Sequence, residues 1–176
     1  MPPASSSDRW TLFGLGSNIR PEKYLPEAAR RLAEHATAVR CSSVWQSRPV
    51  GFRDQPDFLN AVVAIRSRWE LVRWQEELIP AIEQQLGRQR DPNNKNAPRT
   101  IDIDLLLHGD WVGAVGKHRL PAPELLERWF VAVPAAEVAP YLRHPTDGRT
   151  LRQIAHQLWQ SLDETPRTRP DVVLLE

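Results

Sequence analysis

Apolar residues recur along the chain at two spacings, which together predict an alternation of strands and helices. Intervals of three and four residues predict helices at about 26–36, 71–86 and 151–158, the second ending at Gly87. Apolar and β-branched runs predict strands at 10–14, 39–46, 58–66, 99–107 and 130–133, and a hairpin near 109–116. Ser17 or Asn18 is expected to cap the first helix, and Pro80 should kink or break the second.

This pattern also indicates the fold class. Strands and helices are interleaved with roughly equal weight but without the regular alternation of a doubly wound parallel sheet, which favours an α+β domain. We expect one domain over 1–176, with 1–9 and 163–176 as loosely ordered extensions. The apolar run 172–175 is hydrophobic enough to dock on the domain.

The composition is that of an ordinary globular protein and narrows the classes of function. The 176 residues include 23 basic and 22 acidic side chains, a formal net charge of +1. Nucleic-acid-binding proteins usually carry a large basic excess, so we expect no nucleic-acid partner and only a local positive site. The single Cys41 cannot form an internal disulfide, and no signal peptide or long apolar run is visible. We therefore expect a soluble, cytoplasmic protein without a membrane partner.

Two irregular segments are candidates for functional loops. The first, 47–57, has turn residues at both ends, and the second, 88–97, has the composition of a mobile basic loop. Loops of this length inside a small domain tend to be functional. The 16 prolines of the chain also fit several irregular loops.

Asp102 and Asp104 are the clearest candidates for chemistry. Two positions apart on a strand, they share one face with Cα atoms about 6 to 7 Å apart, while Ile101 and Ile103 point into the core. Magnesium prefers oxygen ligands and completes its shell with water and phosphate, so this pair suits two ions bridged by a polyphosphate. The alternative is a solvated edge strand, but the apolar run 105–107 favours a central strand, where carboxylates need partners.

Basic residues precede the two aspartates, namely Arg88, Arg90, Lys95 and Arg99. Guanidinium groups match phosphate oxygens in geometry, and together with metal ligands they form the usual set of groups for phosphoryl transfer. Each arginine alone is better explained by an ion pair with Glu83, Asp91 or the aspartates. The cluster favours a phosphate site.

Other common signatures are missing from the sequence. Gly14-x-Gly16 lacks the third glycine of a dinucleotide-binding turn, because Ile19 stands in its place, and there is no Gly-x-x-x-x-Gly-Lys-Ser/Thr segment. The five histidines lack metal-ligand spacing, and Cys41 is expected to be a small buried hydrophobe. No Ser-His-Asp or Cys-His arrangement indicates a nucleophile.

The segment 97–106, Ala-Pro-Arg-Thr-Ile-Asp-Ile-Asp-Leu-Leu, resembles the signature of the 6-hydroxymethyl-7,8-dihydropterin pyrophosphokinase family. Further similar motifs follow the family's order along the chain: Gly14–Asn18, Ser42–Ser47, Pro49, Gly51, Asp54–Asn60, Ile82–Glu83, Leu86–Arg90, Arg128, Phe130, Pro134 and Glu137–Pro140. The resemblance spans about residues 10–158, and several independent motifs in the correct order argue against chance.

The resemblance implies a ferredoxin-like α+β fold, with a central antiparallel sheet flanked by helices and long mobile active-site loops. It also implies a monomeric enzyme of folate biosynthesis. The reaction would transfer the β,γ-pyrophosphate of ATP to the hydroxymethyl oxygen of 6-hydroxymethyl-7,8-dihydropterin and give AMP, with two Mg²⁺ ions as cofactors.

The resemblance further implies roles for individual residues. Asp102 and Asp104 would hold the Mg²⁺ ions, with Arg88 and Arg99 as the other catalytic residues. The reduced pterin would bind Ser47, Pro49, Val50, Gly51, Phe58, Asn60 and Phe130. ATP would bind Glu83, Arg88, Arg90, Arg99, Ile103, Lys117 and Arg128. Two aromatic faces and a few edge contacts hold a flat, amide-rich ring well, although each phenylalanine alone would be assigned to the core.

The sequence departs from the family pattern at four places. Ala97 replaces the signature glycine, Ala122 stands where the family has the histidine of a Pro-His step, 93–96 lacks a tryptophan, and Ser47-Arg48 replaces Thr-Pro or Glu-Pro. These departures leave open a divergent homologue that binds pterin or nucleotide with weak or no catalysis. A magnesium nucleotidyltransferase, which also uses paired strand aspartates but would release pyrophosphate, is a third possibility.

Overall fold

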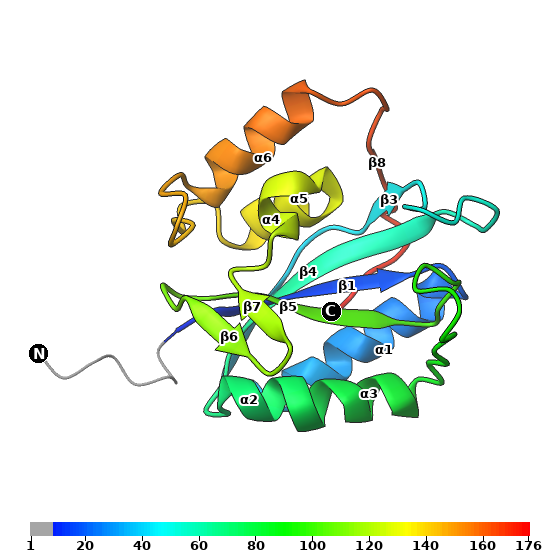
Figure 1. Ribbon diagram of the computed structural model, residues 1–176, viewed down its shortest axis with the longest axis horizontal. Coiled ribbons are helices and arrows are strands. Elements are labelled where there is room, and N and C mark those ends of the chain that lie inside the picture. The colour runs from blue at the N-terminus through cyan, green and yellow to red at the C-terminus, as the bar shows by residue number, and fades with distance from the viewer. Residues whose placement is uncertain (1–8) are drawn as a thin grey trace, which may run out of the picture.

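The computed structural model describes residues 9–176, which form a sheet between two layers of helices (Figure 1). The strands are β1 (Thr11–Ser17), β2 (Ala38–Cys41), β3 (Trp45–Ser47), β4 (Phe58–Arg66), β5 (Asp102–His108) and β8 (Arg167–Thr168). They form one sheet in the order β5-β1-β4-β3-β8, with β2 also on β4, and every pairing is antiparallel. The expected α+β fold with a central antiparallel sheet is confirmed.

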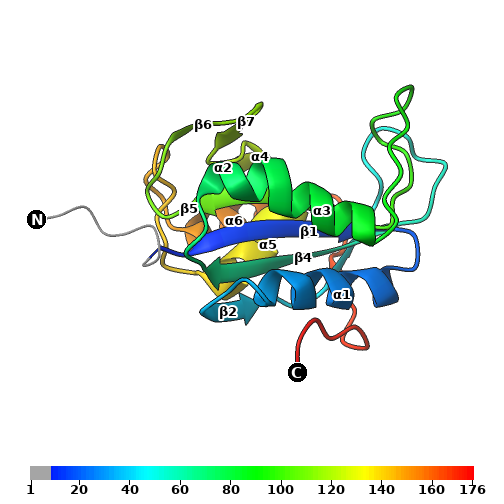
Figure 2. The ribbon, with the colours of Figure 1, turned by 90° about the horizontal axis from the view of Figure 1, so that it is seen from below.

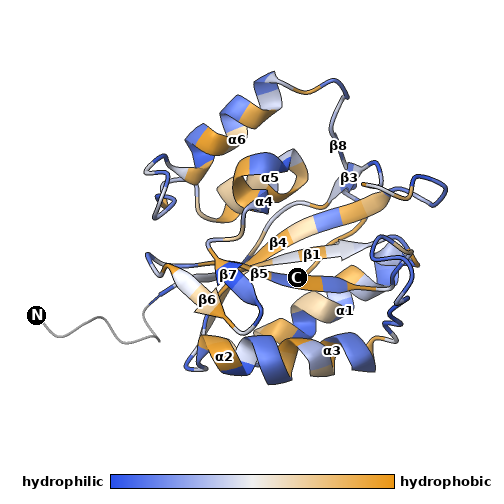
Figure 3. Ribbon diagram, in the orientation of Figure 1, coloured by the Kyte–Doolittle hydropathy of each residue, from blue (hydrophilic) through white to orange (hydrophobic). Residues whose placement is uncertain are grey.

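The helices form two layers on opposite faces of this sheet. One layer contains α1 (Pro21–Ala33) and a continuous helix made of α2 (Leu71–Arg73), the π-helical segment η2 (Trp74–Leu78) and α3 (Ile79–Gln85). Figure 2 shows α1 and α3 lying along the strands. The other layer contains α4 (Glu124–Glu127), α5 (Trp129–Val138) and α6 (Leu151–Gln160). Each layer forms a core with its own sheet face, and Figure 3 shows hydrophobic and hydrophilic residues alternating along the helices α3 and α6. Within residues 9–176, no helix is long and apolar enough to cross a membrane.

Helix α1 begins five residues earlier than the sequence predicts. Pro21 opens the helix, where its missing N–H costs nothing, and Pro26 is accommodated inside the first turns. The predicted cap is wrong, because the residue before the helix is Arg20 and no side chain of the described residues caps it. The amide of Asn18 instead donates to Gln55 Oε1 and the Pro56 carbonyl.

The second predicted helix is continuous across Pro80. The irregularity lies just before the proline, in η2, whose wider turns accommodate a residue that cannot donate a backbone hydrogen bond. The predicted hairpin also exists but lies further along, as β6 (Gly113–Val115) and β7 (His118–Leu120) around a turn at Gly116.

The single strand predicted over 39–46 is two strands, β2 and β3, that lie one after the other along β4. Ser42 causes the interruption, because its hydroxyl accepts a hydrogen bond of 2.8 Å from the Val62 amide and so enters the ladder. The strand predicted at 130–133 is wrong, since this segment belongs to α5. Helix α5 is buried against both the sheet and α6. Because it is apolar on all sides, its hydrophobic residues do not recur at the spacing that identifies a helix.

The expectation that Asp102 and Asp104 lie on a central strand is also wrong. Within residues 9–176, strand β5 pairs only with β1 and is the edge of the sheet. It is nevertheless apolar on both faces because both helical layers cover it, Leu105 facing one core and Leu106 the other. The chain after β7 protects the free edge, where the Ala122 amide donates to the Leu106 carbonyl at 2.8 Å.

The carboxyl-terminal extension is ordered on the domain. Strand β8 pairs with β3, and Val172 and Leu174 are buried in the core, as the apolar character of 172–175 allows. Of the proposed amino-terminal extension, residues 1–8 lie outside the described part, and Arg9 forms an ion pair of 3.3 Å with Asp110.

Candidate active site

Two glycines on β1 form the floor of the candidate site. Gly16 is paired with Asp102 on β5 and with Asn60 on β4, and Gly14 is paired with Asp104 on β5. Residues directly opposite one another in a sheet share a face, so both carboxylates and the Asn60 amide lie on the same side. The glycines leave this floor open, since a Cβ atom on Gly16 would lie 3.4 Å from Asn60 Oδ1.

A cavity of about 620 Å³ lies above this floor. It is the part of the sheet face that α4 and α5 leave uncovered, and it brings together ten predicted site residues: Ser47, Val50, Phe58, Asn60, Arg99, Asp102, Asp104, Lys117, Arg128 and Phe130. These residues come from strands β3, β4 and β5, the β6–β7 turn, the loops beside the strands, and the start of α5. Such a volume is in the usual range for a small-molecule site.

Apolar and amide groups line one side of the cavity. Phe58 and Asn60 alternate with buried residues on β4, so both point to the cavity face, and Phe130 approaches from α5. Asn60 is held in place because its amide donates to Ser47 Oγ at 2.8 Å. The guanidinium of Arg99 lies 5.8 Å from the centre of the Phe58 ring.

A buried network of charges surrounds Asp102. Arg88 Nη1 donates to Asp102 Oδ1 at 2.7 Å and to Glu83 Oε1 at 2.5 Å, and Arg99 Nη1 donates to Asp102 Oδ2 at 3.2 Å. The side chains of Arg88 and Glu83 are 10% and 6% exposed, so these charges are largely removed from water. Burial opposes the charge on Arg88, but Asp102 and Glu83 raise its pKa above the usual value.

Glu83 connects this network to strand β5, which carries the candidate metal ligands Asp102 and Asp104. Its Oε1 also accepts the Ile103 amide at 3.0 Å, and its Oε2 accepts from Arg90 at 3.3 Å. Burial raises the pKa of the Glu83 carboxyl, while the Ile103 hydrogen bond and Arg88 act in the opposite direction. Glu83 and Ile103 therefore lie behind the cavity wall, and both are buried.

Asp104 has a different environment from Asp102. Among the described residues neither Arg88 nor Arg99 pairs with it, and its side chain faces the cavity. Although it is exposed to that cavity, protein walls remove it from bulk water, and this burial raises its pKa to about 8, with further contributions from Asp102 and Glu83. A carboxylate without a protein cation beside a second carboxylate fits a hard divalent cation. Within residues 9–176 no cluster of three or more acidic, His or Cys side chains could hold a metal, so water and phosphate would supply the other ligands.

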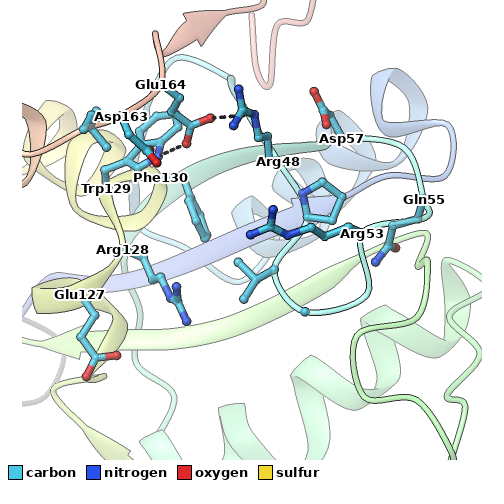
Figure 4. Close-up of a pocket in the computed structure, with 14 residues that line it drawn as sticks. Arg48, Arg53, Gln55, Asp57, Glu127, Arg128, Trp129, Phe130, Asp163 and Glu164 are labelled. Atoms are coloured by element: carbon cyan, nitrogen blue, oxygen red, sulfur yellow. Dashed lines mark hydrogen bonds and ion pairs between the residues drawn. The ribbon is translucent and has the colours of Figure 1, made fainter.

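A second cavity of about 580 Å³ adjoins the first and shares Arg48, Val50, Arg128 and Phe130 with it. It lies between the loop after β3, the start of α5 and the segment after α6 (Figure 4). The predicted pterin residues Pro49 and Gly51 line this cavity and not the first. Arg88 and Arg90 line neither cavity, and Arg90 is 74% exposed in its side chain.

The loops 48–57 and 88–99 lie side by side at one end of the sheet (Figure 2). Gln55 joins them, because its amide donates to the Asn96 carbonyl at 2.6 Å and to the Phe52 carbonyl at 2.5 Å. Asn18 accepts from the Arg99 amide at 2.9 Å and donates to Gln55 Oε1 at 2.8 Å. The two irregular segments predicted from sequence are thus connected to each other and to the end of β1.

Several residues that line the first cavity are not predicted from the sequence. His118 and Arg119 of β7 and Glu124 of α4 line it, beside the predicted Lys117. The hairpin expected near 109–116 lies further along the chain, so the sequence assigns no place to His118 and Arg119. The sequence pattern Gly14-x-Gly16 was visible, but its role as a floor depends on the register of β1 against β4 and β5.

The comparisons with known proteins agree with one another. A model of the 7,8-dihydro-6-hydroxymethylpterin-pyrophosphokinase (HPPK) family matches residues 12–140. A Synechocystis protein named 2-amino-4-hydroxy-6-hydroxymethyldihydropteridine pyrophosphokinase is 36% identical over 168 residues, which are 90% of this chain and 83% of the relative. A Bacillus subtilis protein of the same name is 35% identical over 154 residues, 84% of this chain and 89% of the relative.

The fold is similar to that of solved structures. The crystal structure of Plasmodium falciparum HPPK-DHPS wild type matches with a TM-score of 0.66 and 12% identity, over 85% of this chain and 44% of the other. This likeness concerns the fold alone, and the present chain spans less than half of that longer one. The extent of the family match and the identity to its members over most of their length place this chain in the 7,8-dihydro-6-hydroxymethylpterin-pyrophosphokinase family.

Proposed function

We propose that the 620 Å³ cavity is the active site and that it holds a reduced pterin, ATP and Mg²⁺ side by side. The reaction follows from membership of the family. The enzyme transfers pyrophosphate from ATP to the hydroxymethyl group of 6-hydroxymethyl-7,8-dihydropterin, a step of folate biosynthesis. The observation that supports the placement is that one cavity contains the Asp102–Asp104 pair together with Phe58, Asn60 and Phe130. One chain supplies all these groups, so we propose that it acts as a monomer.

The pterin ring would bind between the aromatic and amide groups of the cavity. Phe58 and Phe130 come from different elements and offer apolar surface to a flat ring. Asn60, fixed by Ser47, would read the hydrogen-bonding edge of the ring. The open floor over Gly16 allows a planar ligand to approach the sheet closely.

The nucleotide phosphates would lie on the basic side of the cavity. Arg99, Lys117 and Arg128 line it from three separate segments. Arg88 is buried behind Asp102 and holds that carboxylate in place, so we propose that it positions Asp102 as well as adding positive charge. Asp102 and Asp104 would hold the Mg²⁺ ions, which when bound neutralise phosphate charge.

In this reaction the protein mainly positions the two substrates and compensates the negative charge of the phosphates. The hydroxymethyl oxygen loses its proton to water and forms a bond to the β-phosphorus of ATP, while the bond from that phosphorus to the α,β-bridging oxygen breaks and its electron pair leaves with AMP. The cavity walls hold the pterin oxygen and the phosphates in one enclosure, and the guanidinium and ammonium groups stabilise the charge that moves to AMP.

A product assay tests the proposal. The protein is incubated with ATP, Mg²⁺ and 6-hydroxymethyl-7,8-dihydropterin, and AMP and the pterin pyrophosphate are quantified. We expect both products in equal amounts, and we expect Asp104→Asn to lower turnover by at least about 100-fold. Asp110→Asn is the matched control, because Asp110 is 83% exposed in its side chain and pairs only with Arg9 among the described residues.

The outcome distinguishes this proposal from its alternatives. Release of free pyrophosphate with AMP on the product would indicate a nucleotidyltransferase, and binding of both ligands without AMP would indicate a binding protein. If Asp104→Asn kept the turnover of the parent protein, the assignment of the acidic pair would be wrong. Ala97 and Ala122 depart from the family pattern, but Arg119 and His118 line the same cavity and add positive and polar groups to its nucleotide side.

A further inference from the structure

We infer that the carboxyl-terminal segment 162–176 supports the substrate site and that Glu164, within it, is a positioning residue for the pterin. This inference rests on the proposed pterin site between Phe58 and Phe130. It concerns residues outside the segment 12–140 that the family model matches. Among residues 9–176, the hydrogen bond and ion pair of Glu164 go to Trp129 and Arg48 and not to a predicted site residue, so its effect must pass through one of these two residues.

The segment is firmly attached on both sides of Glu164. Before it, helix α6 packs on α5. After it, Gln46 of β3 is paired with Arg167 and Trp45 with Thr168, and the Arg169 amide donates to the Val44 carbonyl at 2.8 Å. Further on, Val172 and Leu174 are buried in the core on the opposite face of the sheet. The backbone at 163–166 is therefore held between two anchored elements.

Glu164 joins two walls of the adjoining cavity. Its Oε1 accepts a hydrogen bond of 2.8 Å from Trp129 Nε1, and its Oε2 lies 3.8 Å from Arg48 Nε (Figure 4). The Glu164 side chain is 19% exposed, whereas that of Arg48 is 71% exposed. An exposed ion pair at this distance contributes little, so the hydrogen bond to Trp129 is the stronger of the two contacts.

Trp129 transmits this contact to the proposed pterin site. Its ring is almost fully buried and meets the Phe130 ring edge-on, with centroids 5.9 Å apart and planes at 85°. It also meets Trp45 of β3 edge-on at 6.2 Å. A buried indole N–H requires a partner, and Glu164 is the acceptor that the structure gives it. Glu164 thereby fixes the ring against which Phe130 packs, and Phe130 lines both cavities.

Arg48 is the residue that Glu164 faces at the other wall. Arg48 directly follows Ser47, whose hydroxyl holds the Asn60 amide. Arg48 lies at the junction of the two cavities, 3.8 Å from Glu164, but this exposed pair is too weak to fix its side chain. The positioning effect of Glu164 therefore passes through Trp129 to the aromatic side of the proposed pterin site.

Direct binding measurements test this inference. Affinities of the parent protein and of each variant are measured by calorimetry for 6-hydroxymethyl-7,8-dihydropterin in the presence of α,β-methylene ATP and Mg²⁺, and for the nucleotide analogue alone. We expect Glu164→Ala to weaken pterin binding about tenfold and to leave the nucleotide affinity within about twofold, because only the pterin side is disturbed. Glu164→Gln keeps an oxygen that accepts from Trp129 and should recover most of the pterin affinity.

Two further variants make the test specific. Asp171→Ala is the matched control, since Asp171 lies in the same segment and, in the described part of the chain, pairs only with the exposed Arg169. Trp129→Phe removes the donor, should match Glu164→Ala in pterin affinity, and should add little to it in the double variant. It also keeps the test valid if Glu164→Ala fails to fold.

The possible results separate this inference from the proposed function. If Trp129→Phe and any folded Glu164→Ala bind pterin within about twofold of the parent protein, or lose pterin and nucleotide affinity equally, the positioning role is wrong. If Phe58→Ala leaves the pterin affinity unchanged, the proposed pterin site itself is wrong. A loss in Phe58→Ala without a loss in Glu164→Ala or Trp129→Phe rejects the inference alone.

Discussion

Arg88 donates a hydrogen bond of 2.7 Å to Asp102, and the same nitrogen also donates to Glu83. One buried cation thus connects a carboxylate of the candidate metal pair to a carboxylate on helix α3. Asp104, two residues away, has no such partner among residues 9–176. The pair is therefore asymmetric, with one carboxylate neutralised by the protein and the other open to a cation from solution.

Arg88→Ala should destabilise the fold by about 3 kcal/mol, because it leaves the buried Glu83 carboxylate without its closest cation. Arg90→Ala is the matched control, since Arg90 is 74% exposed and pairs with the same carboxylate at 3.3 Å. We expect the control to change the free energy of unfolding by less than about 1 kcal/mol. Urea denaturation of both variants measures the difference, and equal losses would contradict a buried role for Arg88.

Gly16→Ala should weaken pterin binding about tenfold while leaving the fold intact. The added Cβ would lie 3.4 Å from Asn60 Oδ1 and 3.8 Å from Phe58 Cδ1, and so would fill the floor of the proposed site. Gly16 does not have a positive φ, so alanine should if anything raise the free energy of unfolding, by about 0.5 kcal/mol.

Calorimetry with the pterin and thermal unfolding of the same sample check this prediction together. The affinity for α,β-methylene ATP serves as the internal control and should stay within about twofold. Unchanged pterin affinity in a stable Gly16→Ala protein would place the ring elsewhere in the cavity.

The sequence predicts best those parts of the molecule in which local pattern and tertiary burial agree. The strand at 58–66 and the start of the last helix at Leu151 are found where predicted, because each has a strong apolar pattern of its own. Helix α5 is not predicted, because it is buried on two sides and its apolar residues therefore do not recur at helical spacing. The edge position of β5 is not predicted either, because helices cover both faces of this strand and make it as apolar as a central one.

The candidate site is predictable only as far as it is local in sequence. The Asp102–Asp104 pair can be read from two positions on one strand. The placement of Gly14 and Gly16 between these aspartates and β4 depends on register, and the contact of Glu164 with Trp129 joins residues 35 positions apart. No local pattern encodes such contacts, so only the folded chain reveals them.

Gln55→Ala should loosen both loops at the end of the sheet. Gln55 connects the loops through the Asn96 carbonyl and Asn18, so its loss removes contacts from 48–57 and 88–99 at once. Hydrogen exchange measured by mass spectrometry should become faster in both segments. Gln46→Ala is the control, because among residues 9–176 the Gln46 side chain bonds only to Asp57 and its loss should affect the first loop alone. Faster exchange confined to 48–57 in Gln55→Ala would contradict the coupling.

His108 should make the fold sensitive to acid. Burial lowers the pKa of its imidazole, with a further contribution from Arg9, and its Nδ1 lies 2.8 Å from Thr11 Oγ1 inside the core. The unfolded chain therefore binds a proton more readily than the folded chain. The free energy of unfolding should decrease as the pH is lowered below about 6.5, where the imidazole of the unfolded chain takes up its proton. His108→Asn keeps a polar atom near Thr11 but cannot titrate, and should flatten this part of the pH profile. Urea denaturation between pH 5 and 7.5, a range set by the unfolded-state value, compares the two proteins, and parallel profiles would show that another group is responsible.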